Sequence, residues 1–304
     1  MKGWRRFILL LLLGHLPATP ALCDGMGAPD NSLALKLDNE LDSLAVGDVQ
    51  PPDLLTPVAM IYDEQEQRSL YAKNEEAVVP IASISKLMTA MVLLDARLPM
   101  AGKVTISKRD MVDDFEGSHS RMRPGMVLTR GELLKLALMA SENRATAALA
   151  RTFPGGTRAM VAQMNAKASR LGMKDTYFAD PTGLSSDNVS TARDLVRMVL
   201  AAQDYEPIHK ATTSVYHRVV PDGFRPMNFG NTNPLVRSAS WKIGISKTGY
   251  ISEAGRCLVM KADLNRRPVV IVLLDASSKR IRLGDANRIK EWMDGLDASG
   301  QQRL

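Results

Sequence analysis

The sequence predicts an α+β domain in which one antiparallel sheet is built from both ends of the chain, with a helical lobe inserted between its strands. Strand-like segments occur near the start, over residues 58–73, and in the last third, over residues 241–275, whereas residues 83–203 have helical periodicity. The composition of the 304 residues, 45% hydrophobic and 24% charged, is that of a globular protein and excludes disordered and collagen-like classes.

Residues 1–23 have the layout of a secretory signal peptide. Positive residues at positions 2, 5 and 6 precede the apolar run 7–13, which is too short to span a bilayer because a transmembrane helix needs about 20 residues. Leu22 stands where a lipoprotein signal carries a small residue, so we expect cleavage near Cys23 without lipidation. The mature protein is therefore predicted to be periplasmic.

Removal of this segment takes away three positive charges and no negative ones, so the formal net charge falls from +6 to +3. Such a small excess gives no reason to expect binding to nucleic acid. Cys257 is then the one remaining cysteine, and it lies in an apolar segment. We therefore expect a buried side chain there and no internal disulfide.

Residues 24–52 mix Gly, Pro, Asp and Asn and are predicted to be a partly ordered lead-in to one domain over residues 53–295. The first element of that domain is a predicted hairpin. Its strands are residues 58–63 and 68–73, and the polar residues 64–67 form the turn between them.

The middle of the chain is predicted to be helical. Residues 83–94 are apolar on nearly all sides, which indicates a helix buried inside the domain. Thr129 and Glu132 form a capping-box pattern that begins a second helix. Further helices are predicted over residues 143–152, 156–171 and 190–203, the last of them capped by Ser190 or Thr191.

The last third is predicted to contain three strands, over residues 241–248, 255–262 and 269–275. A helix over residues 281–294 and a polar tail over residues 296–304 follow them. The apolar positions of this helix suit packing on the sheet, so no stable membrane anchor is predicted.

Ser83 and Lys86 lie one helical turn apart at the start of the buried helix, so the amine can reach the hydroxyl. The amides of a helix N-terminus also favour developing negative charge. A pair at this spacing also arises by chance, with the serine as a helix cap and the lysine in solvent. Against this alternative, Lys86 lies in an otherwise apolar helix, and burial lowers the pKa of an amine enough for it to act as a base.

Ser141 and Asn143 follow the second helix at a break in the chain. Ser186 and Asn188 match the same Ser-x-Asn pattern, but they lie in a turn-rich loop ahead of a helix cap, where such residues are commonly structural. The context therefore favours Ser141 and Asn143 as the functional pair.

Lys247, Thr248 and Gly249 end a predicted strand. A strand edge with these side chains, and a glycine that permits close backbone approach, suits a peptide that binds as an additional strand. Residues 244–249 differ from a phosphate-binding loop, because the Gly-Lys-Ser/Thr ending and the following helix are missing from the pattern.

Ser-x-x-Lys, Ser-x-Asn and Lys-Thr-Gly in this order form the signature set of penicillin-binding proteins and serine β-lactamases. Over residues 53–295 the sequence resembles the low-molecular-mass penicillin-binding proteins of the D-alanyl-D-alanine carboxypeptidase family, and within it the periplasmic D-alanyl-D-alanine endopeptidases. The resemblance includes residues 80–90, 138–145 and 180–184. It implies a β-lactamase-like DD-peptidase fold and a catalytic domain over residues 53–295.

The resemblance also implies an acyl-enzyme route. Ser83 attacks the carbonyl of the penultimate D-alanine, Lys86 accepts the proton, and Ser141 relays it to the leaving amine. The backbone amides of Ser83 and Tyr250 would form the oxyanion hole. Water then hydrolyses the ester.

The same resemblance implies the substrate-binding residues. Asn143 would hold the substrate's peptide group and the base lysine. Lys247 and Thr248 would bind the terminal carboxylate, and Gly249 belongs to the same binding strand. Peptidoglycan stem peptides and cross-links are then the expected substrates, and β-lactam antibiotics the expected covalent inhibitors.

Several alternatives to an endopeptidase remain. A class A β-lactamase needs a loop glutamate for deacylation, but the single glutamate between Asn143 and Lys247 is Glu206, which lies outside such a loop. Carboxypeptidase relatives carry a further C-terminal domain and an amphipathic anchor, for which few residues follow Asp275. A catalytically silent peptidoglycan-binding protein should lack Ser83 or its base.

We therefore expect an endopeptidase that cleaves D-alanyl-diaminopimelate cross-links, with a carboxypeptidase as the alternative. No metal is predicted, because His119, His209 and His217 are far apart in the sequence and lack ligand spacing. No cofactor is predicted either.

Overall fold

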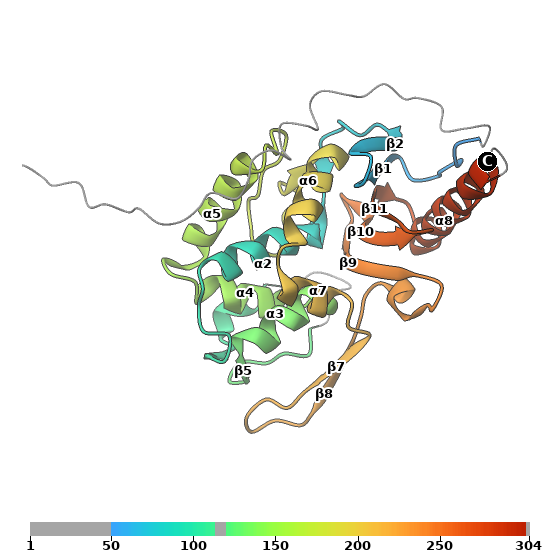
Figure 1. Cartoon of the computed structure of the whole chain (residues 1–304). Coiled ribbons are helices and arrows are strands. Elements are labelled where there is room, and N and C mark those ends of the chain that lie inside the picture. The colour runs from blue at the N-terminus through green and yellow to red at the C-terminus, as the bar shows by residue number, and fades with distance from the viewer. Residues whose placement is uncertain (1–49, 113–119, 302–304) are drawn as a thin grey trace, which may run out of the picture. The chain divides into compact units, whose positions relative to one another are not determined.

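The computed structural model describes residues 50–112 and 120–301, so the expected signal peptide and most of the lead-in lie outside the described residues. An antiparallel sheet has the strand order β2-β1-β11-β10-β9 (Figure 1). Its strands are β1 (Val58–Asp63), β2 (Arg68–Lys73), β9 (Lys242–Ile251), β10 (Gly255–Leu264) and β11 (Arg267–Ala276). Because β1 pairs with β11, both ends of the domain meet within one sheet, as the sequence predicts.

Two hydrophobic layers cover the sheet, because successive residues of a strand point to opposite faces. In β10, Cys257 and Val259 belong to the layer that contains the helices of the lobe, whereas Leu258 and Met260 belong to the layer that contains α8 (Lys279–Gln301). Figure 1 shows the lobe helices on one side of the sheet and α8 on the other. The helix predicted at the end of the chain therefore packs on the sheet.

The helical lobe lies between β2 and β9 in the sequence. It contains the 3-10 turn η1 (Ala82–Ser85) and the helices α2 (Lys86–Asp95), α3 (Arg130–Met139), α4 (Asn143–Arg151), α5 (Gly156–Arg170), α6 (Ala192–Ala202) and α7 (Glu206–Thr212). The capping box at the start of α3 is present, since Thr129 and Glu132 each accept a hydrogen bond from the other's backbone amide. At α6 the cap is Thr191, which accepts a hydrogen bond from the amide of Asp194.

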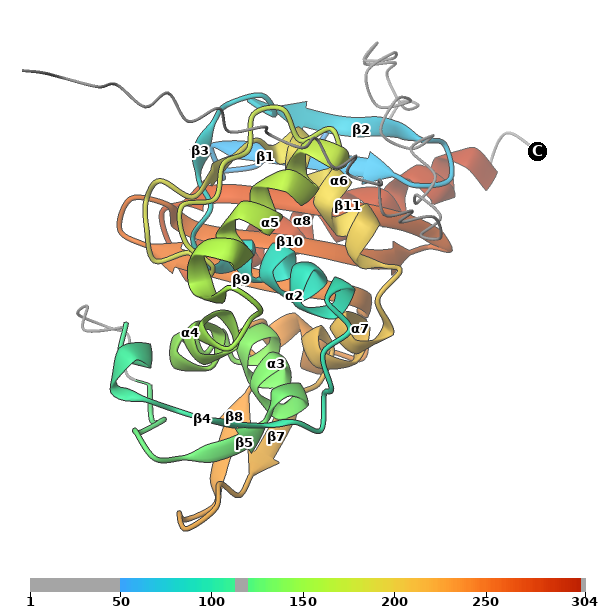
Figure 2. The same cartoon turned by 90° about the vertical axis from the view of Figure 1, so that its left-hand side faces the viewer.

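Several short elements were not predicted. The described residues contain paired ribbons of β3 (Val79–Pro80) with β6 (Val189–Ser190), β4 (Lys103–Thr105) with β5 (Val127–Thr129), and β7 (Tyr216–Val219) with β8 (Met227–Gly230). Strands of two to four residues are too short to show a period-two pattern. The β7–β8 hairpin extends beyond the lobe helices (Figure 2).

The C-terminal helix also differs from the prediction. The final helix, α8, continues to Gln301 and so includes part of the segment predicted as a polar tail. Polar composition alone does not end a helix, and residues 295–301 contain no proline. Along the described residues, no helix combines the length and the apolar character that crossing a membrane requires.

Candidate active site

Ser83 lies in η1, immediately before α2. Its Oγ accepts a hydrogen bond of 2.7 Å from Nζ of Lys86, the first residue of α2. The residue before it, Ala82, has a φ of +48°, a left-handed conformation that costs a residue with a side chain about 1–2 kcal/mol. Strain of this kind persists only where the surrounding structure holds it, and it is common at active sites.

The Lys86 amine is buried, with 1% of the residue exposed. Nζ also contacts Oδ1 of Asn143 at 2.7 Å and the backbone oxygen of Thr182. Burial lowers the pKa of Lys86 from 10.5 to about 7, and the charges of Asp180 and Glu142 oppose this shift. A large share of Lys86 is therefore a neutral amine near pH 7, as a general base must be.

Asp180 holds the loop that presents the Thr182 carbonyl to Lys86. Its Oδ1 accepts hydrogen bonds from the backbone amides of Thr182 (2.6 Å) and Gly183 (2.9 Å), and its Oδ2 from that of Ser185 (2.8 Å). Asp180 was not among the predicted site residues. An aspartate before Pro-Thr-Gly is a turn signal, however, because its carboxylate can bond to amides a few residues ahead.

Ser141 lies in the short break between α3 and α4. It has a φ of +57°, so it too adopts the left-handed conformation. Its Oγ accepts a hydrogen bond of 2.9 Å from Nζ of Lys247. Asn143, the first residue of α4, contacts Lys86, so this break connects both lysines of the site.

The rival Ser-x-Asn segment has a structural role. Ser186 is exposed, and Asn188 is fully buried. The Asn188 Oδ1 accepts hydrogen bonds from the amides of Ala179 (2.8 Å) and Asp180 (3.0 Å), and its Nδ2 donates to Oγ of Ser85 at 2.9 Å. These bonds fix the loop against η1.

The predicted Lys-Thr-Gly segment lies on β9, the edge strand of the sheet. Lys247 is buried, and its Nζ also donates to the backbone oxygen of Thr248 at 2.7 Å. Burial holds the pKa of Lys247 well below 10.5, and the charges of Lys86 and Arg282 lower it further. An edge strand has backbone groups without a strand partner on one side, so β9 can pair with an extended peptide.

Arg282 is a further candidate that was not among the predicted site residues. This residue of α8 is 4% exposed, and its Nη1 donates a hydrogen bond of 3.1 Å to the backbone oxygen of Cys257, which pairs with Gly249. Burial lowers the pKa of Arg282 to about 10, so the guanidinium is positive at neutral pH. Arg282 follows Lys247 by 35 residues, so no short sequence motif connects it with the site.

Two glycines allow neighbouring backbone segments to approach Ser83 closely. A Cβ on Gly249 would lie 2.8 Å from the oxygen of Ile81 and 3.2 Å from the amide nitrogen of Ser83. A Cβ on Gly183 would lie 2.0 Å from the oxygen of Ala82, and Gly183 also has a φ of +78°. Both β9 and the Asp180 loop therefore lie close to the backbone that leads into the serine.

We expect Gly183→Ala to lower the free energy of unfolding by about 3 kcal/mol or more, because the added methyl group must displace the backbone before Ser83. Gly223→Ala is a matched control, since Gly223 has a φ of +75° but no atom within 4 Å of its Cβ position. The control should cost about 1–2 kcal/mol. Urea denaturation measures both values, and equal losses would contradict the contact with Ala82.

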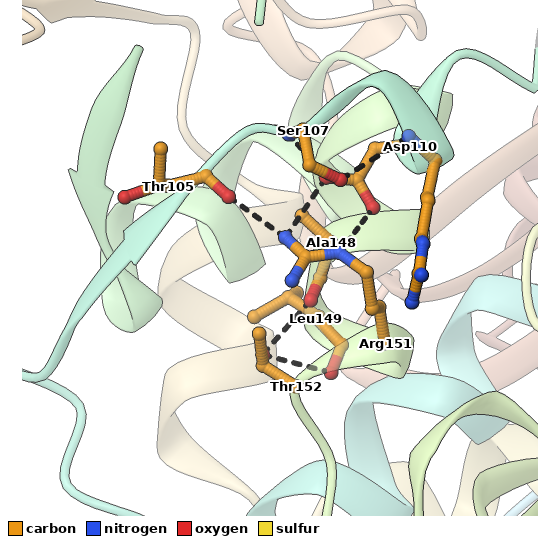
Figure 3. Close-up of polar contacts among 8 residues, drawn as sticks. Thr105, Ser107, Asp110, Ala148, Leu149, Arg151 and Thr152 are labelled. Carbon is orange, nitrogen blue, oxygen red and sulfur yellow. Dashed lines mark hydrogen bonds and ion pairs between the residues drawn. The ribbon is translucent and has the colours of Figure 1, made fainter. Parts of the chain in front are cut away.

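A cavity of about 700 Å³ opens beside Thr182. Its wall includes residues of η2 (Lys108–Asp110), α4, the start of α5 and residues 180–185. Figure 3 shows Arg151 of α4 between Asp110 and the backbone oxygen of Thr105. The guanidinium donates to both carboxylate oxygens of Asp110, at 2.8 and 2.9 Å, so this pair ties η2 to α4.

The structure brings the predicted site residues together. Ser83, Lys86 and Asn143 form one hydrogen-bonded group, and Ser141 and Lys247 form another. The two groups are close enough for the charge of Lys86 to lower the pKa of Lys247. The three remaining predicted residues, Thr248, Gly249 and Tyr250, follow Lys247 on β9.

Known proteins are similar to this chain in sequence. A family model described as D-alanyl-D-alanine carboxypeptidase matches residues 46–278. The chain is 45% identical over 246 residues to a D-alanyl-D-alanine endopeptidase of Pseudomonas aeruginosa, a match that covers 80% of this chain and 78% of that protein. It is 43% identical over 244 residues to a D-alanyl-D-alanine endopeptidase of Escherichia coli, with the same two coverages.

Solved structures support the fold. The Streptomyces K15 DD-transpeptidase superimposes with a TM-score of 0.75 at 28% sequence identity, over 81% of this chain and all of that one. A D-alanyl-D-alanine carboxypeptidase from Mycobacterium tuberculosis gives a TM-score of 0.73 at 27% identity, over 83% of this chain and 95% of that one. The predicted fold class and family resemblance are thus confirmed, and the chain belongs to the D-alanyl-D-alanine carboxypeptidase family of serine peptidases.

Proposed function

We propose that this protein is a D-alanyl-D-alanine endopeptidase of the periplasm, which hydrolyses D-alanyl-diaminopimelate cross-links of peptidoglycan through an acyl-enzyme on Ser83. The observation that carries the proposal is the 2.7 Å contact between Oγ of Ser83 and the buried Nζ of Lys86. It joins a nucleophile to an amine whose pKa is about 7.

The contacts of Lys86 suit a neutral base. A neutral amine has two N–H groups and one lone pair. Asn143 Oδ1 and the Thr182 oxygen can accept the two N–H bonds, which leaves the lone pair for the hydroxyl proton of Ser83. Lys86 would take this proton as Oγ bonds to the D-alanine carbonyl carbon.

Ser141 would deliver a proton to the leaving nitrogen. Its Oγ accepts a hydrogen bond from Lys247, so its own hydroxyl proton is available for donation. The protonated Lys86 would then restore the proton on Ser141. The carbonyl–nitrogen bond breaks, the amine leaves, and water later hydrolyses the ester on Ser83 to return the enzyme.

The carboxylate next to the scissile bond would bind at the cationic end of the site. Arg282 supplies positive charge, and Lys247 and Thr248 supply an amine and a hydroxyl group as hydrogen-bond donors. The backbone amides of Ser83 and Tyr250 would bind the oxyanion, because the short distance between Gly249 and the Ser83 amide places β9 against η1.

The endopeptidase assignment is favoured over carboxypeptidase by the relatives. Proteins named endopeptidases are 45% and 43% identical to this chain, whereas a Bacillus subtilis protein named a carboxypeptidase is 30% identical over 239 residues.

Glu206, the glutamate that could have indicated a β-lactamase, is exposed and forms an ion pair with Lys210 on α7. Penicillin is therefore expected to acylate the protein and leave slowly.

The substrate assay separates the two peptidases. Cross-linked muropeptide dimers and monomeric pentapeptides are supplied in parallel to the purified protein, and products are resolved by chromatography. We expect dimers to be converted to monomers at least about tenfold faster than pentapeptides release D-alanine. Release of D-alanine with dimers untouched would show the carboxypeptidase alternative instead.

A further inference from the structure

We propose that Tyr250 and Arg256 form a subsite for the leaving peptide of the cross-link, in which Arg256 binds a second carboxylate of that peptide. The inference rests on the proposed function, since a leaving peptide exists only when a cross-link is cut. It concerns a part of the substrate that free D-alanine and penicillin lack.

Tyr250 and Arg256 are paired across two strands. They lie directly opposite each other in the β9–β10 register. The guanidinium carbon of Arg256 is 3.4 Å from the centre of the Tyr250 ring, which is a close cation–π contact. Tyr250 is nevertheless 51% exposed. The stack therefore holds a cation at the surface in a fixed position.

The Tyr250–Arg256 pair lies further along β9 from the proposed carboxylate site. Side chains two residues apart on a strand share a face, so Tyr250 lies on the same face as Thr248, roughly 7 Å further along β9. Arg256 is also close enough to Arg282 for its charge to lower the pKa of that guanidinium. Arg282 and Arg256 are thus two neighbouring cations, of which the first is buried and the second is partly exposed.

The charge of Arg256 is available to a ligand. None of the ion pairs between described residues involves Arg256. The Tyr250 ring contacts the guanidinium and positions it without neutralising it. A guanidinium held in this way can bind a carboxylate with two parallel hydrogen bonds.

The chemistry of the two leaving groups differs in the features that this subsite could recognise. Free D-alanine has one carboxylate and a methyl group. The diaminopimelate of a cross-link has the equivalent carboxylate, but a chain of methylene groups replaces the methyl and leads to a stem peptide with further carboxylates. The Tyr250 ring offers apolar surface to the methylene chain, and Arg256 offers a charge to a carboxylate beyond it.

The test compares Arg256→Gln with two other variants. Arg256→Lys keeps the charge but loses the planar fork, and Arg266→Gln removes one positive charge just beyond the opposite end of the same strand. We expect Arg256→Gln to lower kcat/KM for muropeptide dimers about tenfold, with Arg256→Lys intermediate and Arg266→Gln unchanged. The second-order rate of acylation by labelled penicillin should change less than about twofold.

A dimer whose acceptor stem has its distal carboxylates amidated shows whether the lost contact is to a carboxylate. With this substrate, Arg256→Gln and the unmodified protein should have the same kcat/KM, because the partner of Arg256 has been removed. An equal loss with both dimers, or an equal loss for dimers and penicillin, would overturn the inference and indicate a structural role for Arg256.

Binding to a protein that cannot react keeps the subsite separate from the proposed function. In the Ser83→Ala background, the dissociation constant for the dimer should rise about tenfold when Arg256→Gln is added. An unchanged constant would overturn the subsite even if wild-type protein cuts dimers. If wild-type protein cuts no dimers but the constant still rises, the endopeptidase proposal fails and the subsite stands.

Discussion

Replacing Ser83 with alanine is expected to abolish covalent labelling by penicillin and to lower hydrolysis of muropeptide dimers by a factor on the order of 10⁴ or more. The reason is that Ser83 Oγ is the atom that would form the ester, and its contact with Lys86 is the base–nucleophile pair of the site. No other group in this contact can form an acyl-enzyme of the same kind, because Lys86 would yield a stable amide.

Labelled penicillin, denaturing electrophoresis and mass spectrometry measure this effect directly. Ser186→Ala is a suitable control, since Ser186 belongs to the rival motif and is exposed in a loop. The control should bind penicillin as the unmodified protein does. An adduct that persists on Ser83→Ala would contradict the role of Ser83, and thermal melting would show whether the variant is folded.

Much of the fold could be predicted from local patterns. The hairpin strands at residues 58–63 and 68–73 agree with β1 and β2 residue for residue, because two short segments that contain consecutive apolar residues flank a polar turn. The buried helix was also recognisable, although its first turn is the 3-10 segment η1. The ribbon of β7 and β8 was missed, because strands of four residues are too short to show a period-two pattern.

The residues of the candidate site could be predicted only where they lie together in one short segment, so that their spacing indicates contact. Ser83 and Lys86 are one turn apart, so their spacing alone indicates contact. Arg282 and Thr182 reach the site through the tertiary fold: α8 packs behind β10, and the Asp180 loop brings a backbone carbonyl to Lys86. Every residue has a backbone carbonyl, so the sequence does not indicate which one contacts Lys86. No motif connects an arginine on a distant helix with the site, so neither group could be inferred without the structure.

Lys86 should control the pH dependence of acylation. If neutral Lys86 is the base, the second-order rate of acylation by penicillin should increase about tenfold between pH 6 and pH 8, with half of the increase near pH 7. Stopped-flow measurements over this range test the rise.

Replacing Lys86 with methionine should slow acylation by a factor on the order of 10²–10⁴, because the base is lost while the buried aliphatic chain is retained. Lys242→Met, at the exposed start of β9, is the matched control and should leave the rate unchanged. A slow rate that still rose through pH 7 in Lys86→Met would show that another group is the titrating base.

The same substitution should also change stability in a pH-dependent way. The pKa of Lys86 is lower in the folded protein than the 10.5 of an exposed lysine, so burying the charged form costs free energy. This cost is absent above pH 10.5, grows as the pH falls, and is complete below pH 7, where a shift of this size corresponds to about 5 kcal/mol. Lys86→Met removes the cost, so its stability relative to the unmodified protein should increase as the pH is lowered from 10.5 to 7. A stability difference that does not vary with pH would mean that Lys86 stays protonated in the folded protein, and the amine would then be an electrostatic partner of Ser83 rather than its base.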